Sequence, residues 1–199
     1  MQVNNLLFPL AGAAVTTLLT VGMPSVHAEP IAISNPSFES PSVFNGSFNI
    51  ANITGWSVIN TGNPGVFNPS SNSFNSVLDG IQTLYSNGAT VYQTLPTTLA
   101  PNTIYTLGIS VGRRLDFTTF PGFTIELRAG NTVLASANQT NIPVPSPGKF
   151  ERLTLTYISP SSVPVGQPLE IRLKSAGAQT NFDFVTLDAR RYSPRTISE

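Results

Sequence analysis

The stretch that decides the fold is residues 122–138, GFTIELRAGNTVLASAN. Apolar and polar residues alternate along its first half, as they do in a strand with one buried face. The apolar residues on the shared face are Phe123, Ile125 and Leu127. A Gly-Asn pair at 130–131 then supplies a two-residue turn of the kind that joins antiparallel strands. We therefore predict a β-hairpin that joins residues 122–129 to residues 132–138.

The same alternation recurs along the rest of the chain, in short runs separated by residues that favour turns. The chain has 17 Pro and 15 Gly, and no stretch has a convincing helical period. The apolar residues that share a face in further runs are Tyr105, Leu107, Ile109 and Val111, then Leu153, Leu155 and Tyr157, then Leu169, Ile171 and Leu173. About nine or ten such strands predict an all-β, two-layer antiparallel sandwich of the jelly-roll type, with a closed barrel as the alternative.

Residues 1–28 are typical of an export signal. The segment from Leu6 to Met23 is apolar and uncharged, and it is followed by Val26-His27-Ala28, a small-residue cleavage site. We expect the signal to be removed, so that the protein is secreted or lies at the cell surface; a retained N-terminal anchor is the alternative. The remaining residues, 29–199, have the length of a single domain.

The composition argues against several classes of function. With 10 Lys and Arg against 10 Asp and Glu, the net charge is zero, so we expect no basic surface for nucleic acid or anionic lipid. The chain has no Cys, and its one His, His27, lies in the segment that export would remove. The mature chain therefore lacks thiol nucleophiles, histidine bases and the common zinc ligands. We expect a binding protein and not an enzyme.

Three short motifs follow one another in a specific order. They are Asn35-Pro36-Ser37-Phe38-Glu39, Gly55-Trp56-Ser57-Val58 and Phe182-Asp183-Phe184-Val185-Thr186-Leu187. Together they resemble the galactose-binding-like jelly rolls of carbohydrate-binding modules and of exported bacterial proteins, including cyanobacterial ones of the PEP-CTERM class. The resemblance implies a jelly-roll domain that binds carbohydrate without catalysis. It also implies a structural calcium ion, held by an acidic residue of the first strand and one of the last strand.

Glu39 and Asp183 are the acidic residues at those two positions. Asp183 has the strand parity of Val185 and Leu187, which directs its carboxylate to the apolar side unless a bulge intervenes. A charge there needs a partner. The resemblance implies that both carboxylates bind Ca²⁺, a cation that prefers oxygen ligands. The alternative is a salt bridge or a hydrogen-bonded pair.

The stretch 113–121 is the candidate ligand-binding loop, because it concentrates charge and aromatic rings in a chain poor in charge. The candidate residues are Arg113, Arg114, Asp116, Phe117 and Phe120. Arg and Asp can form directional hydrogen bonds to sugar hydroxyls, and Phe can stack on a ring. Alternatively, the phenylalanines cap the sandwich and Arg114 pairs with Asp116. The loop at 60–76 is a second candidate.

Other residues that could serve a ligand are expected to be structural. A Trp that follows Gly at the start of an early strand, as Trp56 does, belongs more often to a core than to a sugar-binding platform. Buried glutamines such as Gln82 and Gln93 usually satisfy neighbouring backbone groups. Glu126 and Glu170 lie beside Arg128 and Arg172, so cross-strand ion pairing accounts for these carboxylates.

Three functions remain open at this point. The first, which we expect, is an exported module whose partner is a glycan or cell-surface polysaccharide, with no nucleic-acid partner and no membrane insertion after signal cleavage. The second is a structural or adhesive component of a cell surface or extracellular matrix. The third is a weak glycoside hydrolase that uses two of the carboxylates.

Overall fold

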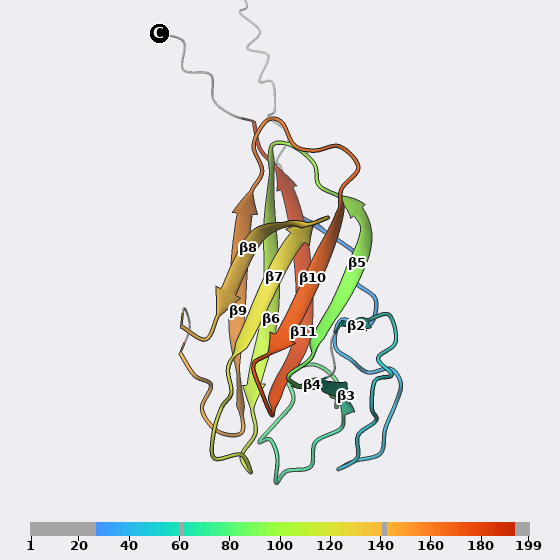
Figure 1. Cartoon of the computed structure of the whole chain (residues 1–199), viewed down its shortest axis with the longest axis vertical. Coiled ribbons are helices and arrows are strands. Elements are labelled where there is room, and N and C mark those ends of the chain that lie inside the picture. Colours follow the sequence, from blue (N-terminus) through green and yellow to red (C-terminus); the bar gives the residue numbers. More distant parts are fainter. Residues whose placement is uncertain (1–26, 60–61, 141–142, 194–199) are drawn as a thin grey trace, which may run out of the picture.

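The computed structural model describes residues 27–59, 62–140 and 143–193. Within these ranges the chain forms eleven strands and no helix, and the strands build two antiparallel sheets that pack face to face (Figure 1). This arrangement confirms the predicted all-β, two-layer sandwich. Most of the expected export signal, residues 1–26, lies outside the described residues. No helix that could cross a membrane is found in the described part of the chain.

The first sheet has the strand order β3-β4-β11-β6-β9, and β1 also pairs with β11. Its strands are β1 (Glu29–Pro30), β3 (Asn63–Phe67), β4 (Thr83–Asn87), β6 (Thr103–Arg113), β9 (Lys149–Ile158) and β11 (Thr180–Arg191). The last strand of the chain therefore lies in the middle of this sheet, between β4 and β6. This central place brings residues of β11 next to loops that come from early in the sequence.

The second sheet has the strand order β2-β5-β10-β7-β8. Its strands are β2 (Ser57–Ile59), β5 (Thr90–Thr98), β7 (Phe123–Ala129), β8 (Thr132–Asn138) and β10 (Pro168–Ser175). In Figure 1, β7, β8 and β10 lie in front of β6, β9 and β11. The predicted hairpin is confirmed: Ala129 pairs with Thr132, and Gly130 takes the positive φ of 54° that its turn requires.

The core lies between the two sheets and is built from the alternating residues. Those on the faces that the sequence predicts are buried, except Tyr157, which is half-buried; for example, Ile109, Leu127 and Ile171 are completely inaccessible to solvent. Complete burial of one such side chain contributes roughly 1.5 to 3 kcal/mol to the free energy of unfolding. Trp56 also belongs to this core, with its ring 5.3 Å from that of Phe38.

The two buried glutamines connect the N-terminal loops to the sheets. Gln93 of β5 donates to the carbonyls of Ser34 and Gly55, each at 2.9 Å, and accepts from the amide of Ser34 at 2.8 Å. Gln82 contacts the carbonyls of Phe38 and Pro41 in the same way, at 3.1 and 3.2 Å. Both side chains satisfy backbone groups, as the sequence predicts.

A bulge in β11 decides where Asp183 points. The register between β11 and β6 shifts between Asp183 and Thr186, and Phe184 has a positive φ of 49°. Phe182 and Val185 are both buried in the core, so the parity of the strand changes between them. Asp183 therefore lies on the outer face of the six-stranded sheet, away from the core, which is the exception that the parity argument left open.

Candidate functional site: an aromatic pocket on the six-stranded sheet

One row of paired residues crosses the outer face of the six-stranded sheet. It runs from Gly65 to Tyr85, Asn181, Gly112 and Phe150, each residue paired in register with the next. The two glycines leave room for larger groups. A Cβ atom at Gly112 would lie 2.5 Å from the ring of Phe150. Large side chains can therefore lie flat on this part of the sheet.

A second, smaller hydrophobic cluster covers this face. It consists of Phe67, Phe74 and Tyr85, with Phe150 packed against it. Phe74 and Phe150 stack with their ring centroids 4.7 Å apart. The segment before β3 extends the cluster, because Phe48 bridges to Phe67 and lies edge-on to Tyr85 at 5.8 Å.

Beside this cluster opens a cavity of about 200 Å³, which we call the aromatic pocket. Its lining residues are Phe48, Asn63, Phe67, Tyr85, Asn87, Arg114 and Gln179. Apolar and aromatic walls with a few polar groups are typical of small-molecule sites. The volume suits one ring system better than an extended polymer.

Arg114 is the cation of this pocket, and its guanidinium is held on several sides. Its Cζ atom lies 4.8 Å from the ring centroids of both Phe67 and Phe117. Its Nε atom donates to Asp116 Oδ1 at 2.8 Å, and Nη2 donates to the other oxygen of the same carboxylate. Its Nη1 atom donates to Gln179 Oε1 at 2.8 Å. The hydrogen bonds from Arg114 lower the pKa of Asp116, so the pair is ionised at neutral pH.

Two polar groups complete the pocket. Asn87 Oδ1 is buried and accepts no hydrogen bond from any residue that the structure describes. Buried acceptors usually have a partner, so this oxygen is a position where a ligand donor would be favourable. Tyr85 donates its hydroxyl to the Asn49 carbonyl at 2.8 Å. Burial raises the pKa of Tyr85, which keeps the phenol neutral.

The structure separates the five residues predicted for the 113–121 loop. Arg114 lines the pocket. Asp116 accepts hydrogen bonds from the Arg114 guanidinium, and the ring of Phe117 stacks on that guanidinium. Arg113 instead donates to the carbonyl of Thr118 at 3.1 Å, within its own loop. Phe120 packs against the main core, with its ring 6.4 Å from that of Phe123. The structure thus realises the second alternative in part, since Arg114 does pair with Asp116 and Phe120 does pack on the sandwich; ligand binding by this loop stays a prediction.

Sequence reasoning did not find most of the pocket. Phe48, the β4 residues Tyr85 and Asn87, and Gln179 come from three segments far apart in the chain and belong to no motif. Asn63 and Phe67 lie within the second candidate loop, 60–76, but nothing in their spacing singles them out. An Asn in a strand-end position was the one available signal, and it is too common to be informative.

Glu39 and Asp183 both contact the loop Leu78–Gln82. Glu39 Oε1 accepts from the amides of Ile81 and Gln82, at 2.9 and 2.8 Å, while Asp183 Oδ2 accepts from the amide of Asp79 at 3.2 Å. Asp183 is 0% exposed, and burial raises its pKa to about 7, although hydrogen bonds from backbone amides lower it. These oxygens have the chemistry that Ca²⁺ requires. No cluster of three or more acidic, His or Cys residues suited to a metal occurs among the described residues, so backbone carbonyls would have to complete such a site.

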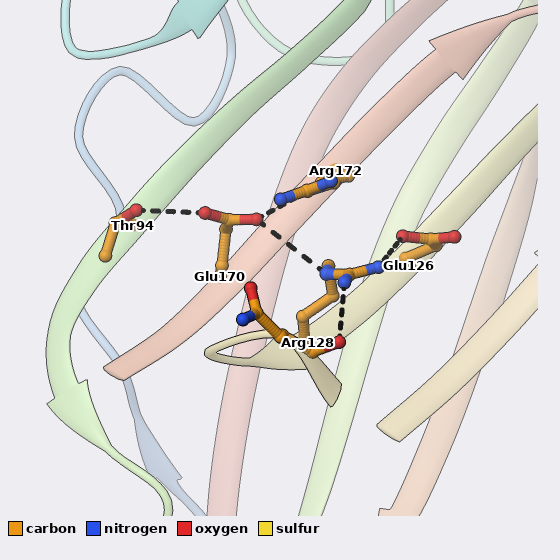
Figure 2. A network of polar contacts seen from close by, with 6 residues as sticks. Thr94, Glu126, Arg128, Glu170 and Arg172 are labelled. Atoms are coloured by element: carbon orange, nitrogen blue, oxygen red, sulfur yellow. Dashed lines mark hydrogen bonds and ion pairs between the residues drawn. The ribbon is translucent and has the colours of Figure 1, made fainter. Parts of the chain in front are cut away.

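The other acidic side chains considered for hydrolysis are engaged on the far side of the sandwich. Figure 2 shows Glu170 between Thr94 and Arg172. Glu170 accepts a hydrogen bond from Thr94 at 3.1 Å and one from Arg172 at 2.5 Å. Its Oε1 atom also lies 4.0 Å from the Nε atom of Arg128. Arg128 pairs with Glu126 at 2.7 Å. The two short ion pairs each join residues of the same strand, Glu126–Arg128 in β7 and Glu170–Arg172 in β10. The cross-strand ion pair, Arg128–Glu170, is the longest. The predicted cross-strand pairing is therefore only a part of this network.

Comparison with known proteins identifies the class to which this sandwich belongs. A family model described as HpiC1-like, HpiC1 cyclase, matches residues 29–188. Because the match spans most of the chain, the protein belongs to this family of cyclases. No curated protein sequence matches it significantly.

Solved structures agree with this assignment. The Stig cyclase Fisc from Fischerella sp. TAU, in complex with (3Z)-3-(1-methyl-2-pyrrolidinylidene)-3H-indole, is 30% identical, with a TM-score of 0.76, over 84% of this chain and 100% of that chain. A cyclase from Fischerella sp. TAU in complex with 4-(1H-indol-3-yl)butan-2-one is 31% identical over the same shares, with a TM-score of 0.74. The tandem CBM22 domain of Paenibacillus barcinonensis Xyn10C has a TM-score of 0.54 but only 16% identity, over 89% of this chain and 50% of that chain. That likeness shows the fold alone.

The expected function is therefore wrong. The family is one of cyclases, which are enzymes, and the two complexes named above hold indole compounds. The non-catalytic carbohydrate-binding module, the glycan partner, the structural or adhesive protein and the glycoside hydrolase are all overturned by this assignment. The resemblance to carbohydrate-binding jelly rolls was correct for the fold. The absence of Cys, and of His outside residues 1–28, misled the prediction, because an enzyme that folds a substrate for ring closure can act mainly by positioning.

Proposed function

We propose that this protein is a cyclase that acts on an indole-bearing substrate in the aromatic pocket. The observation that carries the proposal is a cavity with aromatic walls that Asn87 also lines, a residue whose Oδ1 atom accepts no hydrogen bond from the described residues. Indole is a flat apolar ring with a single N–H donor. Phe48, Phe67 and Tyr85 offer it ring contacts, and Asn87 offers its N–H an acceptor.

The main task of the protein in this reaction is to control the conformation of the substrate. Ring closure joins two parts of one molecule, so an enzyme accelerates it by holding the reacting atoms near each other and excluding water. The aromatic walls restrict the substrate to a folded conformation. The Tyr85 phenol stays neutral because burial raises its pKa, and its hydrogen bond to Asn49 fixes the ring that forms one wall.

Binding and turnover test the proposal separately. For binding, 4-(1H-indol-3-yl)butan-2-one is titrated into the protein by calorimetry, beside its N-methylindole analogue, which lacks the donor. We expect the N–H compound to bind about tenfold more tightly, since one hydrogen bond to a buried acceptor is lost. If the parent protein binds the two compounds equally well, Asn87 does not accept a hydrogen bond from the indole N–H.

For turnover, indoles with an unsaturated side chain at C3 are incubated with the protein. Ring closure onto a carbon–carbon double bond conserves all atoms, so the product has the mass of the substrate and a new chromatographic retention time. The heat-inactivated protein is the control. Absence of any isomerised product across such substrates, under conditions where the indole ketone binds, would contradict a cyclase activity.

We also propose a structural calcium ion at the loop Leu78–Gln82, with Glu39 and Asp183 among its ligands. The Asp183 carboxyl supports this, because burial raises its pKa and the Asp79 carboxylate raises it further. Calcium would stabilise the ionised form of Asp183 when bound. Export with removal of residues 1–28 remains a proposal of its own, and N-terminal sequencing of the protein from its native source tests it.

A further inference from the structure

We infer that Arg114 selects a substrate whose side chain carries a neutral hydrogen-bond acceptor, such as a carbonyl oxygen or an imine nitrogen. This inference rests on the proposed binding of indole in the aromatic pocket. It adds a second recognition point, opposite in polarity to Asn87. The family match does not name this residue, and the complex with 4-(1H-indol-3-yl)butan-2-one names no partner for the ketone oxygen.

The hydrogen-bond inventory of Arg114 leaves donors available. A guanidinium has five N–H groups. Three of them donate, two to the carboxylate of Asp116 and one to Gln179. One N–H on Nη1 and one on Nη2 have no acceptor in the described part of the chain, and the side chain borders the pocket. A ligand acceptor there would complete the set.

The guanidinium is also held in position before any ligand arrives. Phe67 and Phe117 lie near its Cζ atom at the same distance, 4.8 Å, and the bidentate pair with Asp116 orients its plane. A group fixed in this way loses little conformational entropy when it binds. Arg114 can therefore discriminate between ligands by a directional contact and not only by charge.

The paired carboxylate determines which acceptor fits. Asp116 stays ionised because Arg114 lowers its pKa, so the pair as a whole carries no net charge. An anionic ligand group would approach a cation that is already neutralised and would be repelled by the Asp116 carboxylate. A neutral acceptor uses the free N–H groups without that repulsion.

Three related probes separate these possibilities in binding assays. They are 4-(1H-indol-3-yl)butan-2-one, 3-butylindole, which lacks the ketone, and 4-(1H-indol-3-yl)butanoate, which carries an anion. The parent protein is expected to prefer the ketone to 3-butylindole by about tenfold, as for a hydrogen bond from a charged donor. The butanoate is expected to bind more weakly than the ketone.

Substitutions then assign the preference to Arg114. In Arg114→Met the ketone should lose its advantage, while 3-butylindole should bind within about threefold of the parent, since the aromatic walls remain. Arg114→Lys, which keeps the charge but not the planar fork, should also reduce the preference. Asp116→Asn should improve binding of the butanoate relative to the ketone. Arg113→Met is the matched control, because Arg113 does not line the pocket.

The outcomes distinguish this inference from the proposed function. If none of the indoles binds the parent, the proposed function fails. If the indoles bind and both the Met and the Lys variants, with melting temperatures near that of the parent, keep the full preference for the ketone, the role of Arg114 is overturned. In that case the aromatic pocket still stands as an indole site.

Discussion

Glu39 and Asp183 hold the two ends of one loop. Glu39 accepts the amides of Ile81 and Gln82, and Asp183 accepts the amide of Asp79. Glu39 lies between β1 and β2, near the start of the domain, and Asp183 lies in the last strand, β11. The loop therefore links the start and the end of the domain. Each carboxylate is bound to its own part of the loop.

The buried carboxyl of Asp183 should make stability depend on pH. Its pKa in the folded protein is about 7, above the ordinary value of 3.8, so the folded state binds this proton more tightly than the unfolded state. The resulting stability is fully present below about pH 4 and is lost as the pH rises towards 7, by about 1.4 kcal/mol for each pH unit between the two pKa values. Urea unfolding in a chelator between pH 4.5 and 7.5 measures this.

Asp183→Asn provides the comparison, because an amide resembles the protonated carboxyl. The variant should be about as stable as the parent at pH 4.5 and more stable than the parent at pH 7.5, both in chelator. A parent and variant with parallel pH profiles would show that Asp183 titrates in the folded state as it does in an unfolded chain.

Calcium should reverse that loss. An ion that binds only the folded state raises the melting temperature in proportion to the logarithm of its concentration above Kd. We expect added Ca²⁺ to raise the melting temperature of the parent at pH 7.5, and chelator to lower it. Asp183→Asn and Glu39→Gln should respond much less, while Asp188→Asn, on the same strand, should respond as the parent does. An unchanged melting temperature of the parent at millimolar Ca²⁺ would contradict the proposed calcium site.

Phe48 should contribute to ligand binding more than to folding. It lines the aromatic pocket but is 59% exposed, so its truncation removes ring contacts with a ligand and little core packing. We expect Phe48→Ala to weaken binding of 4-(1H-indol-3-yl)butan-2-one by about 1 to 2 kcal/mol and to change the free energy of unfolding by less than about 1 kcal/mol. Phe44→Ala is the control, since Phe44 is 87% exposed and does not line the pocket. Equal losses of affinity in both variants would point to a general effect of this segment.

Glu170 should matter for stability and not for ligand binding. Its largely buried carboxylate lies between Arg128 and Arg172 on the opposite sheet (Figure 2). Glu170→Gln leaves the Arg172 guanidinium without its carboxylate partner, while Arg128 keeps its pair with Glu126, and should lower the free energy of unfolding by roughly 1 to 3 kcal/mol. Glu151→Gln, at an exposed position of β9, should change it by less than about 0.5 kcal/mol. Urea denaturation compares the two, and a Glu170→Gln protein as stable as the parent would mean that solvent already screens the network.

Much of the fold follows from local sequence. The alternation at Phe123, Ile125 and Leu127 assigns a face to each residue of β7, and the Gly130-Asn131 turn sets the register of the hairpin. These features are local because the side-chain period of a strand and the conformation of a short turn depend on neighbouring residues only. The core positions and the two-layer architecture follow from them.

The site was decided by tertiary structure. The bulge after Asp183 reverses the parity of β11 and moves that carboxylate from the core to the outer face. The aromatic pocket joins Phe48, Tyr85, Arg114 and Gln179, which are close only because β11 lies between β4 and β6. Strand order depends on how the sheets pack as a whole, and no short stretch of the chain encodes it. By itself, therefore, the sequence determined an all-β sandwich and its core, while the tertiary structure determined which distant side chains share one cavity and what that cavity can bind.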